Sequence, residues 1–326
     1  MLSLLISLVI YVGNDFLTQE KQVKLELDNE YYSNISAMCP ADDGGYYLVT
    51  DSGGSFSFDN SIFKVSKEGK TIVKFNKKGQ GPGEIRNLAG IIQYKGKVFV
   101  GERTAPLVHV YDSELNYETD IRTNLGGKLY FVNDNYVGIW NTFFKSENRT
   151  FMLALFSRQE VINSKFYVEL KTDEVPFLVQ AMGGVCSIGD SKYAAITTKR
   201  YQVFLFDTGK GGVQNLFKTE PSHILPYTNY EGDPKRLGKK ATDWVFSFTK
   251  FAAIFHSNGR LYIYYINGKE ESYIDVVTLA GKFLHKKIPM PVHQPLFLDN
   301  DVFGLVKKTE GEDTNTFHLL RKRISK

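Results

Sequence analysis

The chain has 326 residues, and its 40 Lys and Arg residues outnumber its 36 Asp and Glu residues to give a formal net charge of +4. This surplus is too small for the concentrated basic face of a nucleic-acid-binding protein, so we expect no nucleic-acid partner. Aromatic residues make up 14% of the chain, with 24 Phe and 19 Tyr but only 2 Trp, a balance that favours strands over helices.

The chain begins with an uncharged apolar run, residues 1–13, which ends before Asn14 and Asp15. The run is too short to cross a membrane as a helix, so we expect no integral membrane span, and its length suits the apolar part of a secretory signal. No basic residue precedes it, so an apolar strand or helix packed on the protein body is the alternative. We predict a signal or apolar segment over residues 1–20, and an exported protein that is periplasmic or associated with the cell envelope.

Short runs of β-branched and aromatic residues, bounded by Gly, Asp and Asn, recur along the rest of the chain. The clearest unit is a strand at residues 62–65, a polar turn, and a second strand at residues 71–75. Similar units start at residues 108, 153, 203, 274 and 317, so successive starts lie 43 to 50 residues apart except for one interval of 71. This repeat length is typical of a propeller blade.

The strand count predicts an all-β, six-bladed β-propeller with four antiparallel strands per blade, occupying residues 21–326. The last unit lacks a fourth strand, whereas a spare strand at residues 22–27 precedes the first unit. We therefore expect the N-terminal strand to complete the last blade and to remove the open edges of the ring. The long interval contains an insertion at residues 218–243, rich in Pro and Gly, which we predict to be a long loop that is either solvated surface or a docking site for a protein partner.

Between the first and second units, the residues from Gly79 to Glu84 read Gly-Gln-Gly-Pro-Gly-Glu, called below the 79–84 block. A Walker phosphate loop would need Gly where Lys64 stands, and a dinucleotide-binding fingerprint would need a third Gly where Glu84 stands. We interpret the block as the crossover between two blades, in which the glycines supply unusual backbone angles and Pro82 adds stiffness.

The block and the strand that contains Val110, Tyr111 and Asp112 resemble the six-bladed β-propeller family abundant in Bacteroidetes, which is related to the NHL-repeat and TolB-like propellers. The resemblance covers the chain after about residue 20 and is most specific over residues 62–120. It implies the fold and an exported location. Members of this family mostly lack an assigned activity, so the resemblance supplies no catalytic residues.

Blade topology places the crossovers, the insertion and the loops between second and third strands on one face. A concave mouth with a few convergent polar groups is the default binding site there. The candidate ligand-binding residues on this rim are Asp51, Glu84, Arg86, Glu102, Arg103, Trp140, Lys199 and Arg200.

The sequence points to no metal, cofactor or catalytic residue, because its six His residues lack metal-ligand spacing and no Gly-x-Ser-x-Gly motif occurs. Cys39 and Cys186 fall on inner strands of blades one and four, on opposite sides of the channel, so we expect two free thiols. We predict a ligand-binding or scaffold protein of unassigned specificity, which engages a small molecule, glycan or peptide. The alternative is a propeller lyase or hydrolase that acts on a glycan or peptide at the same face.

Overall fold

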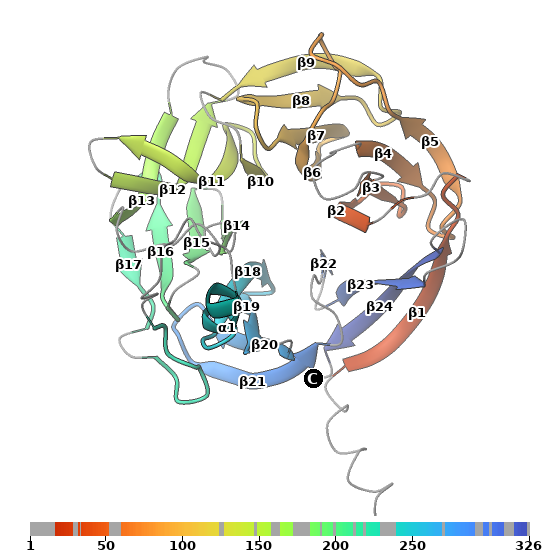
Figure 1. Cartoon of the computed structure of the whole chain (residues 1–326). Coiled ribbons are helices and arrows are strands. Elements are labelled where there is room, and N and C mark those ends of the chain that lie inside the picture. Colours follow the sequence, from red (N-terminus) through yellow and green to blue (C-terminus); the bar gives the residue numbers. More distant parts are fainter. Residues whose placement is uncertain are drawn as a thin grey trace, which may run out of the picture.

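A computed structural model describes most of the chain, namely residues 17–28, 32, 34–51, 60–123, 127–146, 149–157, 164–171, 183–189, 191–197, 200–210, 213–217, 220–228, 239–268, 271–290, 296–299, 302–309 and 316–324. Within these ranges, strands β1 to β24 form six antiparallel sheets of four strands each. The sheets are arranged in a ring (Figure 1). The predicted six-bladed β-propeller is therefore confirmed.

Each blade runs from an inner strand near the centre of the ring to an outer strand at its periphery (Figure 1). In blades one to three the strands are, from inside outwards, β2 (Asn34–Pro40), β3 (Tyr46–Asp51), β4 (Asn60–Val65), β5 (Thr71–Phe75); β6 (Leu88–Tyr94), β7 (Lys97–Glu102), β8 (Leu107–Tyr111), β9 (Tyr117–Arg122); and β10 (Lys128–Val132), β11 (Tyr136–Ser146), β12 (Arg149–Ser157), β13 (Ser164–Lys171). In blades four to six they are β14 (Gly184–Ser187), β15 (Lys192–Ile196), β16 (Val203–Asp207), β17 (Val213–Asn215); β18 (Lys250–Ser257), β19 (Arg260–Asn267), β20 (Glu271–Thr278), β21 (Phe283–Met290); and β22 (Leu296–Asp299), β23 (Val302–Thr309), β24 (Thr316–Ile324), β1 (Leu17–Leu25).

The N-terminal strand closes the ring, as predicted. β1 pairs antiparallel with β24, from Leu17 opposite Ile324 to Leu25 opposite Phe317. Val23 and Leu25 point into the core while Lys24 between them is exposed, which is the alternation expected of an outer strand. Just past the strand, Glu26 N donates to Gly69 O of blade one at 2.7 Å, so the N-terminal segment also joins the last blade to the first.

The core lies between neighbouring sheets, and this explains the apolar runs in the sequence. The second strand of each blade has a sheet on either side, so both of its faces can be covered. On β3, for example, Tyr46, Tyr47, Leu48 and Val49 are all at most 4% exposed. The outer strand β5 has only one covered side, and its Ile72 is 49% exposed.

Two local predictions were wrong. Trp140 was expected in a loop, but β11 continues to Ser146, and the backbone of Trp140 pairs with Lys128 and Leu153. The sequence from Trp140 to Phe144 contains no Gly or Pro that would end the strand.

The insertion is also not entirely a loop, because α1 (Lys239–Val245) forms at its C-terminal end. Ala241 favours a helix, and the rings of Trp244 on α1 and of Phe248 just after it both contact the ring of Tyr227. Residues 1–16, which hold most of the predicted signal segment, and residues 229–238 of the insertion lie outside the described residues. In the part of the chain that the structure describes, no helix has the length and apolar character needed to cross a membrane.

The two cysteines occupy the predicted positions. Cys39 lies on β2 and Cys186 on β14, the inner strands of blades one and four, and neither forms a disulfide.

Candidate functional site

Four of the eight predicted rim residues meet where blades one and two join. The carboxylate of Glu102 accepts hydrogen bonds from the backbone N–H groups of Arg86 at 2.9 Å and Asn87 at 3.2 Å. Arg103 N donates to Asn87 O at 2.7 Å, which holds the loop after β7 against the crossover before β6. Burial raises the pKa of the Asp51 carboxyl, and the nearby charge of Arg103 opposes this shift.

A buried chain of two acids and an imidazole lies beneath this junction. His109 Nδ1 is 2.7 Å from Asp120 Oδ1, and His109 Nε2 is 3.5 Å from Glu102 Oε1. Burial alone would lower the pKa of His109, but the two carboxylates outweigh it and the pKa is raised. Burial would likewise raise the pKa of Glu102, yet His109 and the two backbone N–H groups bring it below its usual value.

The side chains of His109 and Glu102 are each only 2% exposed, so a ligand in solvent cannot reach them. The cluster of Glu102, His109 and Asp120 therefore fixes the crossover between the two blades rather than forming an open site. His109 was not among the predicted site residues, although it lies on β8 opposite Val100 of β7 and therefore diagonal to Glu102.

The 79–84 block packs against blade two and makes its contacts there. The Tyr111 hydroxyl donates to Gly83 O at 3.0 Å. Gly83 has φ 72°, and a Cβ at this position would lie 2.5 Å from Cγ of Tyr117, the first residue of the outer strand β9. Glu84 turns back on its own loop, where Oε2 accepts Gly81 N at 2.8 Å. The block is a packed crossover, and its predicted ligand-binding residue Glu84 makes this hydrogen bond within the block.

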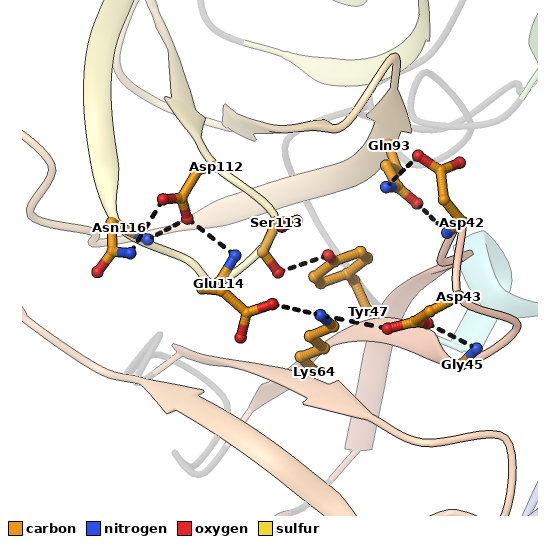
Figure 2. Close-up of polar contacts among 10 residues, drawn as sticks. All are labelled: Asp42, Asp43, Gly45, Tyr47, Lys64, Gln93, Asp112, Ser113, Glu114 and Asn116. Carbon is orange, nitrogen blue, oxygen red and sulfur yellow. Dashed lines mark hydrogen bonds and ion pairs between the residues drawn. The ribbon is translucent and has the colours of Figure 1, made fainter.

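The opposite end of the same two blades carries a second charged cluster, shown in Figure 2. Lys64 Nζ of blade one lies 3.2 Å from Asp43 and 2.7 Å from Glu114 of blade two. Beside it, the Tyr47 hydroxyl donates to Ser113 O at 2.8 Å. These groups satisfy one another, and Lys64 is 5% exposed, so the cluster acts as a clasp between blades.

An open pocket lies on the other side of the ring, between blade four and the insertion. Its volume is about 430 Å³. Three aromatic rings, one proline and three polar side chains line it: Arg200, Tyr201, Gln202, Phe217, Glu220, Pro226 and Tyr227. The loop between β15 and β16 and the connection between β17 and β18 supply these residues, which places the pocket on the face that blade topology predicts for ligands.

Of the eight predicted residues, only Arg200 lines this pocket, and its predicted neighbour Lys199 lies outside the described residues. The aromatic residues Tyr201, Phe217 and Tyr227 were missed. They stand in or beside loops, where no strand alternation marks them, so only the insertion itself signalled this region.

The wall formed by Tyr201 is anchored on blade five. Its hydroxyl donates to Asp275 Oδ2 at 2.9 Å, and its side chain is buried. Asp275, which is fully buried on β20, also accepts from His223 Nε2 at 2.8 Å, the Tyr265 hydroxyl at 3.1 Å and Lys287 N at 2.8 Å. Burial and the Asp275 charge raise the pKa of Tyr201 well above its ordinary value, so the hydroxyl remains a donor.

The insertion side of the pocket is also held in place. Leu225 and Thr249 exchange two hydrogen bonds, Leu225 N to Thr249 Oγ1 at 2.9 Å and Thr249 N to Leu225 O at 3.1 Å. Trp244 Nε1 on α1 donates to Thr228 O at 2.7 Å. The ring of Tyr227, which lies between Leu225 and Thr228 in the sequence, packs edge-on against the ring of Phe248, with ring centroids 5.0 Å apart. The pocket is therefore formed before any ligand arrives.

The pocket presents hydrogen-bonding groups rather than a metal site. Glu220 Oε1 accepts Tyr201 N at 3.3 Å, which ties the insertion to the blade-four loop. Across the described ranges, no group of three or more His, Cys, Asp or Glu side chains is arranged to hold a metal ion.

No protein-family model matches the chain, and no curated protein matches it. Solved structures do. A DUF4221-family member from Bacteroides vulgatus has a TM-score of 0.65 at 11% identity, over 96% of this chain and 100% of that chain. A protein from Bacteroides fragilis that is predicted to be exported has a TM-score of 0.63 at 14% identity, over 97% and 98%.

A streptogramin B lyase is more distant, with a TM-score of 0.53 at 10% identity over 96% of this chain and 99% of the lyase. Identities this low establish a shared fold and nothing further. The predicted resemblance to propellers of Bacteroides is confirmed at that level.

Proposed function

We propose that this protein is an exported ligand-binding protein of the cell envelope, and that its ligand occupies the pocket between Arg200 and Tyr227. One observation carries the proposal: a pocket of about 430 Å³ lies on the expected face, with apolar walls and a few polar groups. Small-molecule sites are usually largely preformed and lined in this way. The anchoring of Tyr201 on Asp275 and of Leu225 on Thr249 means that little ordering remains to be done on binding.

Export is the second part of the proposal. It is supported by the apolar run at residues 1–13 and by the fold shared with a Bacteroides protein that is predicted to be exported. A protein that has lost the apolar run at residues 1–13 and is purified from the periplasm or envelope fraction is the expected mature form.

An enzyme acting on a glycan or peptide is the second candidate, and the convergence of Glu102, His109 and Asp120 is what favours it. The fold that this chain shares with a streptogramin B lyase gives this candidate little support, because the two sequences are only 10% identical. Burial argues against catalysis at this place, because Glu102 and His109 are each only 2% exposed. The binding function is therefore preferred.

The test is a thermal-shift screen of sugars, peptides, carboxylic acids and amines against the mature protein and a Tyr227→Ala variant. A ligand at about a hundred times its Kd stabilises the folded state by about 2.7 kcal/mol, so its binding raises the unfolding midpoint. We expect at least one class to raise the midpoint of the wild type but not of Tyr227→Ala. Glu114→Gln, on the opposite face, is the matched control and should respond as the wild type does.

Equal shifts in the wild type and in Tyr227→Ala would place binding elsewhere and reject the pocket. Chemical change of a screened compound, abolished by His109→Gln, would favour the enzyme instead.

A further inference from the structure

We infer that the ligand of this pocket is a small molecule that carries a carboxylate on an apolar or ring-shaped body. The inference rests on the proposed binding function and names its ligand class. It follows from which polar groups of the pocket are already engaged and which are not.

Arg200 supplies the free cation. Arg200 is a lining residue of the pocket and is exposed, and its guanidinium has no hydrogen-bond or ion-pair partner among the residues that the structure describes. Within the described part of the chain, the one hydrogen bond of Arg200 is made by its backbone oxygen, which accepts Gln202 N at 2.6 Å. A guanidinium presents paired N–H donors whose geometry matches a carboxylate, and such charge-assisted pairs are about twice as strong as neutral hydrogen bonds.

Glu220 brings a negative charge to the same pocket, and one of its carboxylate oxygens is already hydrogen-bonded within the protein. Its Oε1 accepts the backbone N–H of Tyr201 at 3.3 Å, so the carboxylate already stabilises the junction between the blade-four loop and the insertion. It remains a source of repulsion for an anionic ligand. This repulsion gives the inference a second, independent test, because removal of the Glu220 charge should strengthen the binding of an acid.

The rest of the lining selects the body of the ligand. Phe217, Pro226 and Tyr227 form apolar wall, and the Tyr227 ring is fixed by its contacts with Trp244 and Phe248. Ring faces of this kind pack against other rings and against apolar surface. A bare inorganic anion would leave this wall unused, whereas a ring or apolar body beside the carboxylate would cover it.

Size limits the ligand further. A volume of about 430 Å³ is near the lower end of the range of about 300 to 1,000 Å³ that is typical of small-molecule sites. The site therefore fits a single ring-bearing unit or a short chain. An acidic monosaccharide, the carboxyl end of a short peptide and a free aromatic acid share this chemistry.

The experiment compares two pairs of probes, using calorimetry or thermal shift on the mature protein, and in each pair one member carries a carboxylate where the other carries a neutral polar group. One pair is N-acetylphenylalanine and its amide, and the other is glucuronate and glucose. We expect the acid of at least one pair to bind about tenfold or more tightly than its neutral partner, with the preference falling as salt is raised. The pair that shows it distinguishes a peptide or aromatic acid from an acidic sugar.

Two variants make the result specific. Arg200→Gln should abolish the preference for the acid, and Glu220→Gln should increase it. Both side chains are exposed, so the unfolding midpoint without ligand should be unchanged in Arg200→Gln. Tighter binding of the neutral partners, an acid preference that survives in Arg200→Gln, or no binding by any of the four probes would overturn the carboxylate inference. The wider screen with Tyr227→Ala still decides the pocket's function in each of those cases, so the two failures are distinguishable.

Discussion

The Tyr201 hydroxyl donates a 2.9 Å hydrogen bond to the Asp275 carboxylate, and this contact joins a pocket wall from blade four to a buried strand of blade five. Asp275 has no exposed surface, and three further donors converge on it. One carboxylate thus holds together the loop after β15, the start of the insertion and two strands of blade five. Pocket geometry and the stability of this sector should change together.

Asp275→Ala should lower the free energy of unfolding by about 3 to 5 kcal/mol. The substitution removes a buried charge with four donors and leaves the hydroxyls of Tyr201 and Tyr265 and His223 Nε2 without their acceptor. Urea unfolding followed by circular dichroism measures the loss. Tyr201→Phe is the matched control and should cost less, about 1.5 to 3 kcal/mol, since it deletes a single hydrogen bond to a charged group. Equal losses in the two variants would show that Asp275 is not the hub.

Deletion of residues 1–28 should lower the unfolding midpoint by on the order of 10 °C, because β1 closes the ring. Val23 and Leu25 alone bury two apolar side chains, each worth about 1.5 to 3 kcal/mol, and β24 is left with an open edge. Calorimetry measures the midpoint. Deletion of residues 1–16 keeps β1 and is the control. A shared midpoint for the two shortened proteins would refute closure by this strand.

The closure was predictable because its signals are local. Val23 and Leu25 alternate with Lys24 and Glu26, as in a strand with one buried face. The last unit had only three strands in the sequence, so its third strand needed a partner from elsewhere in the chain. The same strand count gave the blade boundaries, since each second strand is a short apolar run between polar turns. Strand ends were harder to predict, as Trp140 illustrates: past this residue β11 continues by pairing with β12, from Phe144 opposite Phe151 to Ser146 opposite Arg149.

The pocket could not be predicted residue by residue, because its contacts are far apart in sequence. Tyr201 and Asp275 are 74 positions apart, and nothing in the residues around either one marks the pairing. Topology did place Glu102 and Arg86 together, since both stand at strand ends on one face. It could not tell that the resulting cluster would be buried, which depends on how tightly the crossover packs.

Lys64→Ala should lower the free energy of unfolding by about 1 to 3 kcal/mol, since the side chain links Asp43 and Glu114 across two blades (Figure 2). The Lys64 side chain is only 7% exposed, while its partners are about half exposed, at 50% and 54%. The cost should therefore lie between those of exposed and buried pairs. Denaturant unfolding at low and high salt measures it.

Lys67→Ala is the matched control for that experiment. Lys67 lies 3.8 Å from Glu68, but the two side chains are 67% and 53% exposed, so the change should cost less than about 0.5 kcal/mol. A loss from Lys64→Ala no larger than this would mean that the clasp does not join the blades energetically.

The two thiols should be unreactive until the protein unfolds. Burial raises the pKa of the Cys39 thiol to about 12 and also raises the pKa of Cys186, so almost no thiolate is present at neutral pH. Folded protein should resist iodoacetamide, and denatured protein without reductant should titrate two thiols per chain. Denatured protein with reductant is the control. Fewer thiols without reductant than with it would reveal a disulfide and contradict the placement of the cysteines on opposite inner strands.

His109 should stabilise the junction of blades one and two most strongly at mildly acidic pH. Its folded-state pKa is raised above the ordinary value of 6.5, because Asp120 and Glu102 favour the imidazolium more than burial opposes it. The folded protein therefore binds this proton more tightly than the unfolded chain. The stabilisation is complete below about pH 6.5 and is lost as the pH rises through the raised pKa.

Two measurements check this for His109. The difference in unfolding free energy between the wild type and His109→Gln should be larger at about pH 6 than at about pH 9. Titration of the His109 ring by NMR should give a pKa above 6.5 in the wild type and a lower one in Asp120→Asn, which removes the carboxylate at 2.7 Å. A His109 pKa at or below 6.5 in the wild type would mean that burial outweighs the two acids. The cluster would then be a neutral hydrogen-bonded support for Arg86 and Asn87 without an ionic contribution.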